Sequence, residues 1–205
     1  MLLRFKGRFL MPKKLAVILP GIGYHKDKPL LYYAAKLAVN AGFEIRCIAY
    51  HDMPEKIRGD ADMMRKAAAL ACEQTAEQLV TANLSEYDSI LLIGKSIGTI
   101  AAARFAAAAS VPCRQIWYTP LIDAFSFPPP PAGSCAAFLG EADPWSDIAQ
   151  IRVTAAEQNV PLYLYPDCNH SLECENVLRN LEILREVMQI TSEFIGGQTE
   201  SIVRK

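Results

Sequence analysis

The chain has 205 residues and a formal net charge of −1, and it is 51% hydrophobic and 21% charged. This length is typical of one domain, and about 70% of the unfolded chain's surface can be buried at this size, so a core forms without disulfides. The near-zero charge, with no dense Lys/Arg stretch, argues against nucleic-acid binding. No apolar run approaches the roughly 20 residues that cross a bilayer, which argues against a membrane protein. We therefore expect one domain over 1–205, with 1–13 as an N-terminal extension or an edge strand.

The N-terminal residues and the cysteines together predict a cytoplasmic protein. Residues 1–14 alternate basic and apolar side chains and lack the uninterrupted apolar core of a signal peptide. None of the six cysteines forms a C-x-x-C pair, and three lie in apolar runs. Reduced, buried thiols are therefore expected, rather than disulfides or a metal site.

Short apolar runs alternate with helical stretches, which is typical of β-α-β units around a parallel sheet. The first strand, 15–19, is apolar throughout, as expected for a strand covered on both faces. Further strands are predicted at 43–50, 89–93, 113–118, 135–140 and 161–165. Helices are predicted at 28–40, 60–81, 99–109, 146–158 and 175–195. The predicted fold is a three-layer α/β/α sandwich with a mostly parallel sheet of about six strands.

One connection differs from the others. Residues 123–133 contain four consecutive prolines, through which a helix cannot run. These eleven residues are enough for a crossover and too few for a lid domain.

The sequence Gly-Lys-Ser-Ile-Gly at 94–98 is the only G-x-S-x-G in the chain. It ends an apolar strand and leads directly into a helix, which is the setting that a nucleophile elbow requires. Such a turn strains the backbone of Ser96, and glycines on both sides remove side chains that would collide with neighbouring elements. The hydroxyl is then lifted clear of the sheet at the positive end of a helix. A glycine-flanked turn with a solvated serine is the alternative, and the strand–turn–helix setting argues against it.

A serine hydroxyl needs a base to remove its proton, and the chain has three histidines: His25, His51 and His170. All three follow predicted strands, on the edge where open parallel sheets bind ligands. In the hydrolase order the nucleophile precedes the acid, which precedes the histidine. Only His170 follows Ser96 in the chain, so His170 is the predicted base.

The acid is expected in the loop after the fifth strand, where Asp143 lies between Ser96 and His170 in the chain. It would hold the imidazole in one tautomer and stabilise the imidazolium. Glu141 and Asp147 are rivals, although Asp147 also suits the cap of the next helix. Asp123, after the fourth strand, is a further alternative.

Two backbone N–H groups are expected to form the oxyanion hole. One belongs to Ile97, directly after the nucleophile, and the other to Ile22, in the loop after the first strand. Gly21 and Gly23 allow that loop to turn. A dinucleotide-binding loop is disfavoured because Lys26 stands where its third glycine would be.

Taken together, the Pro-Gly loop, the elbow, Gly-Glu-Ala-Asp-Pro at 140–144 and Asn-His-Ser at 169–171 resemble the α/β-hydrolase superfamily. The resemblance covers about 15–195 and is strongest to the small cap-free branch that includes dienelactone-hydrolase-like proteins. It implies the fold, a catalytic triad and no cofactor. The chain departs from this pattern in Pro20-Gly21, where His-Gly is usual, and in lacking a lid. Ser96 also stands where a dienelactone hydrolase has cysteine.

Several side chains are candidates for the substrate pocket, although packing is the alternative role for each. Lys95 would either favour an anionic substrate or form a structural salt bridge. The other candidates are Tyr24, His25 and His51 at the rim, and Phe125 and Phe127 as an apolar acyl wall.

The predicted function is a serine hydrolase that cleaves an ester or thioester through an acyl-enzyme, as a monomer or homodimer. Without a lid, small acyl groups, or acyl groups displayed on a larger molecule, suit the site better than long free lipids. An amidase or peptidase with the same triad is an alternative. A non-catalytic interaction protein with this fold is another, since fold does not imply function.

Overall fold

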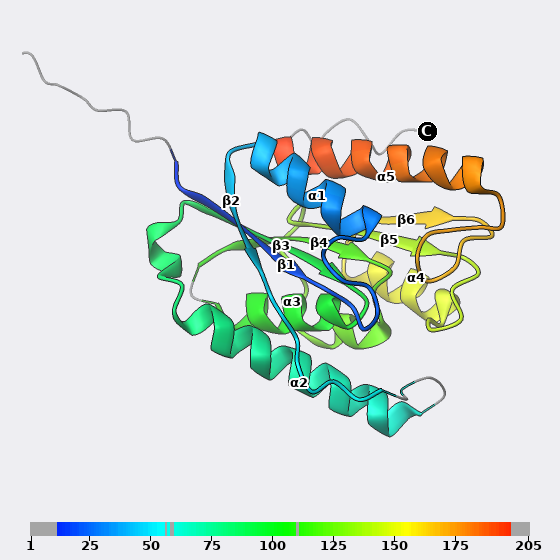
Figure 1. Ribbon diagram of the computed structural model, residues 1–205, viewed down its shortest axis with the longest axis horizontal. Coiled ribbons are helices and arrows are strands. Elements are labelled where there is room, and N and C mark those ends of the chain that lie inside the picture. The colour runs from blue at the N-terminus through cyan, green and yellow to red at the C-terminus, as the bar shows by residue number, and fades with distance from the viewer. Residues whose placement is uncertain (1–11, 56, 58–59, 110, 198–205) are drawn as a thin grey trace, which may run out of the picture.

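The computed structural model describes residues 12–55, 57, 60–109 and 111–197. Its first strand begins at Lys14, and the predicted N-terminal extension or edge strand lies almost entirely outside the described residues. Helices cover both faces of one central sheet (Figure 1).

The six strands are all parallel and follow the order β2-β1-β3-β4-β5-β6. Their bounds are β1 Lys14–Leu19, β2 Phe43–Cys47, β3 Ser89–Lys95, β4 Cys113–Tyr118, β5 Cys135–Gly140 and β6 Leu162–Tyr165. The predicted α/β/α sandwich with a parallel sheet of about six strands is confirmed.

The five α-helices divide between the two faces of the sheet (Figure 1). One face carries α1 (Pro29–Asn40) and α5 (Val177–Gly196), and the other carries α2 (Ala61–Val80), α3 (Ile97–Ala108) and α4 (Ile148–Glu157). Alternate side chains of β3 enter the two cores: Leu92 packs on the α2–α3 side, and Leu91 and Ile93 pack on the α1–α5 side. The centre of the sheet is buried on both faces, which explains the uninterrupted apolar runs at 15–19, 90–93 and 135–139.

Two aspartates begin helices. Asp60 accepts hydrogen bonds from the N–H groups of Asp62 and Met63, and Asp147 accepts one from Gln150 N–H. The prediction that Asp147 caps a helix is thereby confirmed.

Two predicted segments differ from the structure. The second strand ends at Cys47 instead of continuing to residue 50, because the backbone of Ala49 pairs with the side chain of Gln78 on α2. The crossover after β4 forms a short 3-10 helix, Ile122–Ser126, before the prolines begin.

The described cysteines are free, as expected. Cys47 is exposed and Cys174 is partly exposed, so the expectation of buried thiols holds only for the other four. None of the described helices is long and apolar enough to cross a membrane.

Candidate active site

Ser96 occupies a strained turn between β3 and α3. Its backbone has φ 55° and ψ −121°, a conformation that residues with a side chain rarely adopt. The neighbouring glycines make the turn possible: a Cβ on Gly98 would lie 2.2 Å from the carbonyl oxygen of Leu19, and one on Gly94 would lie 2.6 Å from that of Gly98. The backbone geometry is that expected of a nucleophile elbow.

The structure brings Ser96, His170 and Asp143 into one hydrogen-bonded chain. Ser96 Oγ lies 2.8 Å from His170 Nε2, and His170 Nδ1 lies 2.7 Å from Asp143 Oδ2. A carboxylate can only accept, so Nδ1–H donates to Asp143 and leaves Nε2 to accept the Ser96 hydroxyl proton. This is the tautomer that a general base for Ser96 requires.

The loops that carry Asp143 and His170 are held together by backbone contacts. A Cβ on Gly140 would lie 2.2 Å from the carbonyl oxygen of Cys168, so only glycine permits this approach. The same carbonyl accepts a 3.0 Å hydrogen bond from Ala142 N–H. This contact fixes the loops after β5 and β6 side by side. Gly140 lies three residues before Asp143, and Cys168 lies two residues before His170.

Asp143 is buried, and further donors fix its carboxylate. Oδ1 accepts a 2.9 Å hydrogen bond from Trp145 N–H, and Oδ2 accepts one of 3.3 Å from Ser146 Oγ. The three rivals do not take this position. Glu141 pairs with Arg152 on the surface, Asp147 caps α4, and Asp123 is exposed on the crossover.

Burial lowers the pKa of His170 below its ordinary value of 6.5. The hydrogen bond to Asp143 opposes this shift, and the positive charge of Lys95 adds to it. A lowered pKa keeps the imidazole neutral at pH 7, which is the form that accepts a proton.

Two backbone N–H groups are available beside Ser96. Ile97 is the first residue of α3, so its N–H has no acceptor within the helix. Ile22 lies in a tight turn closed by the paired backbones of Gly21 and Tyr24, at 3.1 and 3.2 Å. In the described part of the chain, neither N–H has a hydrogen-bond acceptor. Both N–H groups are therefore unused by the fold in the described part of the chain.

Lys95 is a buried cation beside the nucleophile, with only 1% of its surface exposed. Its Nζ lies 4.9 Å from the centre of the Tyr24 ring, and burial lowers its pKa to about 7. Within the described residues it has no ion pair, so the predicted structural salt bridge is wrong. With 1% of its surface exposed, Lys95 has no open face for an anionic substrate in this structure.

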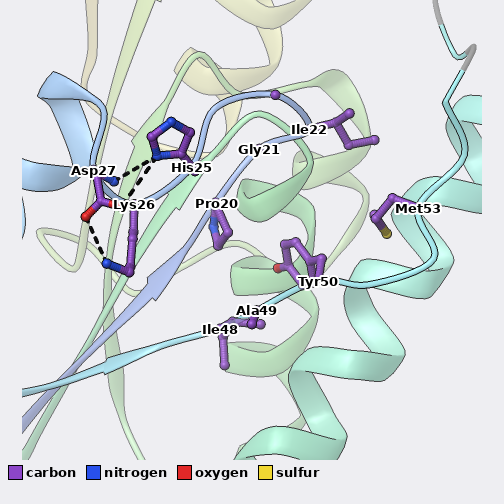
Figure 2. A pocket seen from close by; sticks show the side chains of 11 residues that line it. Pro20, Gly21, Ile22, His25, Lys26, Asp27, Ile48, Ala49, Tyr50 and Met53 are labelled. Atoms are coloured by element: carbon purple, nitrogen blue, oxygen red, sulfur yellow. Dashed lines mark hydrogen bonds and ion pairs between the residues drawn. The ribbon is translucent and has the colours of Figure 1, made fainter.

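A pocket of about 440 Å³ lies between the loops that follow β1 and β2 (Figure 2). Of the six predicted pocket side chains, only His25 lines it. Its lining comprises Pro20, Gly21, Ile22, Gly23, His25, Lys26, Asp27, Ile48, Ala49, Tyr50 and Met53.

The other predicted pocket side chains lie elsewhere. Phe125 is buried edge-on against Trp117, with ring centres 5.1 Å apart, so it takes the alternative packing role and is not an acyl wall. Phe127 packs near α2, in a separate cavity with Met64. Tyr24 is buried and its hydroxyl accepts from Leu30 N–H, while His51 is bound to Gln74 of α2.

Sequence reasoning missed the far wall of this pocket, which Ile48, Tyr50 and Met53 provide. It also missed Trp145, whose ring centre lies 5.8 Å from that of His170. The predicted second strand, 43–50, contained a signal for this wall. The carboxyl ends of neighbouring parallel strands meet at one edge of a sheet, so residues at the end of this strand were candidates for the pocket. Among the described residues, no group of three or more His, Cys, Asp or Glu side chains could hold a metal ion.

The fold is that of α/β hydrolases without a lid, as comparison with solved structures shows. A serine hydrolase without a lid from Xanthomonas campestris aligns with a TM-score of 0.65 at 16% identity, over 96% of this chain and 87% of its own. An esterase from Pyrococcus furiosus aligns at 0.63 and 13%, over 91% and 82%. A Bacillus cereus carboxylesterase aligns at 0.54 and 17%, over 89% and 87%.

Searches with the sequence against family models and curated proteins find no match. The solved structures thus confirm the resemblance to α/β hydrolases at the level of the fold.

Proposed function

We propose that the protein is a serine hydrolase that cleaves an ester or thioester through an acyl-enzyme intermediate. The observation that carries the proposal is the hydrogen-bonded chain from Ser96 Oγ through His170 to Asp143, at 2.8 and 2.7 Å, on a strained elbow. Hydrolases and esterases among the solved structures of the same fold support it.

In the first half of the reaction, Ser96 Oγ attacks the substrate carbonyl carbon as its proton passes to His170 Nε2. Asp143 stabilises the resulting imidazolium through Nδ1–H. The carbonyl oxygen becomes an oxyanion and accepts hydrogen bonds from the N–H groups of Ile22 and Ile97. The tetrahedral intermediate then collapses, His170 returns the proton to the leaving oxygen or sulfur, and an ester on Ser96 remains.

In the second half, water replaces the leaving group. His170 accepts a proton from the water as its oxygen attacks the acyl carbon, and the same two N–H groups receive the oxyanion. The proton then passes from His170 to Ser96 Oγ, which releases the acid and restores the enzyme. Every proton transferred in the two halves passes through His170 Nε2, which lies 2.8 Å from Ser96 Oγ.

The test is labelling with a fluorophosphonate, followed by mass mapping. We expect a single adduct on Ser96 in the wild type and none in Ser96→Ala. In His170→Ala we expect labelling to slow by at least about 100-fold, because the hydroxyl loses its base. A correctly folded wild-type protein that takes no label would contradict the proposal and favour a non-catalytic role.

A further inference from the structure

The pocket shown in Figure 2 and the loops that carry the acid and the base follow strands at opposite ends of the sheet order. In the sheet order β2-β1-β3-β4-β5-β6, the pocket follows the ends of β1 and β2, and Ser96 follows β3. Asp143 and His170 follow β5 and β6, at the other end of the sheet. The nucleophile therefore stands between the pocket and the catalytic pair.

The chemistry of acyl transfer orients a substrate along this line. His170 Nε2 must protonate the leaving atom, so the leaving group has to lie on the side of β4 to β6. The carbonyl oxygen has to face the free N–H groups of Ile22 and Ile97. The third substituent of the carbonyl carbon, the acyl chain, is then directed towards β1 and β2, where the pocket lies.

Gly21 joins the pocket to the nucleophile. It lines the pocket, and a Cβ added to it would lie 3.1 Å from Ser96 Cβ. The pocket and the nucleophile are therefore neighbours, with only the backbone of Gly21 between them.

The wall of the pocket is suited to hydrocarbon. Ile22, Ile48 and Met53 present aliphatic side chains, and the Tyr50 hydroxyl is engaged by Thr75 of α2 at 3.1 Å. The charged side chains at one end neutralise each other, with Lys26 Nζ 2.8 Å from Asp27 Oδ1, and both are exposed. The volume of about 440 Å³ lies within the range of small-molecule sites.

We propose that this pocket binds the acyl group of the substrate, as an unbranched apolar chain of medium length, while the leaving group lies on the side of His170 and Trp145. The inference rests on the proposed serine hydrolase function and names its substrate class. It moves the acyl site from the crossover after β4, where Phe125 and Phe127 lie, to the loops after β1 and β2.

The test is kcat/KM for a series of p-nitrophenyl esters from acetate to octanoate. We expect kcat/KM to rise about fourfold for each added methylene until the pocket is full. Two filling variants, Ala49→Phe and Met53→Trp, should lower the ratio of kcat/KM for hexanoate to that for acetate by at least about tenfold. Phe127→Ala is the matched control and should keep the wild-type ratio.

Three results would overturn the assignment of the pocket while leaving the hydrolase intact: no dependence on chain length, filling variants that keep the wild-type ratio, or a Phe127→Ala variant that loses it. In each of these cases Ser96 still takes the fluorophosphonate label. A wild-type protein with neither labelling nor ester hydrolysis would overturn the hydrolase function and this inference with it. Circular dichroism of each variant separates loss of the fold from loss of the pocket.

Discussion

Two carboxylates follow β5 within three residues of one another, and they have opposite environments. Asp143 is buried against His170, whereas Glu141 forms an exposed ion pair with Arg152 at 2.6 Å. We expect Asp143→Asn to lower kcat by about 10³–10⁴-fold, because an amide that donates to Nδ1 leaves the imidazole in the wrong tautomer. Glu141→Gln, a change of the same size and charge, should keep kcat within about threefold, since exposed ion pairs contribute little. The measurement is steady-state kinetics on one ester. Equal losses in both variants would contradict the assignment of the acid.

Lys95 couples the stability of the fold to pH. Burial holds its pKa at about 7, whereas an unfolded lysine titrates near 10.5. Between these values the unfolded chain carries a proton that the folded chain lacks, so the free energy of unfolding contributed by Lys95 rises with pH. Below pH 7 both states are protonated and the dependence ends.

Comparison with Lys95→Met isolates this contribution, because the variant keeps the buried thiols and tyrosines that also titrate. We expect the wild type to gain about 1 kcal/mol of unfolding free energy per pH unit relative to the variant between pH 7 and 9.5. Urea denaturation at several pH values provides the measurement. A difference that stays constant over this interval would mean that the amine of Lys95 remains charged in the folded protein.

Among the elements, the contact between β1 and α3 depends on one glycine. A Cβ on Gly98 would meet the backbone of both Leu19 and Pro20, at 2.2 and 2.7 Å, and backbone cannot move aside as a flexible side chain can. We expect Gly98→Ala to lower the free energy of unfolding by about 3 kcal/mol or more. The control is Gly196→Ala, near the end of α5, where a Cβ meets nothing within 4 Å. That change should be neutral or stabilising by up to about 1 kcal/mol. Thermal and urea unfolding of the two variants test this, and equal destabilisation would contradict it.

The predictable part of the fold is the part with a local signal. β4 and β5 occupy the predicted residues, and β5 is apolar throughout, as expected for a strand covered on both faces. Ser96 could be identified because the elbow has its own motif, and chain order then selected His170 from three histidines. Asp143 needed a choice among carboxylates, and the backbone contact between Gly140 and Cys168 that positions it has no signature in the sequence.

The pocket could not be predicted from local sequence because its walls come from separate loops. Ile22 lies in the loop after β1, and Tyr50 lies in the loop after β2. The two residues are close because β2 pairs with β1 at the edge of the sheet. Phe125 had the aromatic character expected of a wall, but the 3-10 helix turns it towards Trp117 and into the core. In an irregular segment, tertiary packing decides which way a side chain points, and a periodic sequence pattern does not predict that packing.

At the scale of the whole molecule, the reactivity of two buried thiols can show whether the loop that carries His170 unfolds together with the sheet. Cys135 lies within β5, and Cys168 lies two residues before His170, with both fully or almost fully buried. Burial raises the pKa of both thiols, so neither forms the reactive thiolate while the fold is closed. The carbonyl of Cys168 is also fixed by Ala142 N–H and packed against Gly140.

We therefore expect the exposed Cys47 and the partly exposed Cys174 to react with a disulfide reagent in the native protein, and the buried thiols to react only as the domain unfolds. Cys168 and Cys135 should be modified at the same rate at every urea concentration, because a loop locked to the end of β5 opens only with the sheet. Mass mapping of timed reactions measures each site. If Cys168 reacted faster than Cys135 in dilute urea, the loop that holds His170 would open by itself, and the spacing of Ser96 and His170 would then fluctuate independently of the fold.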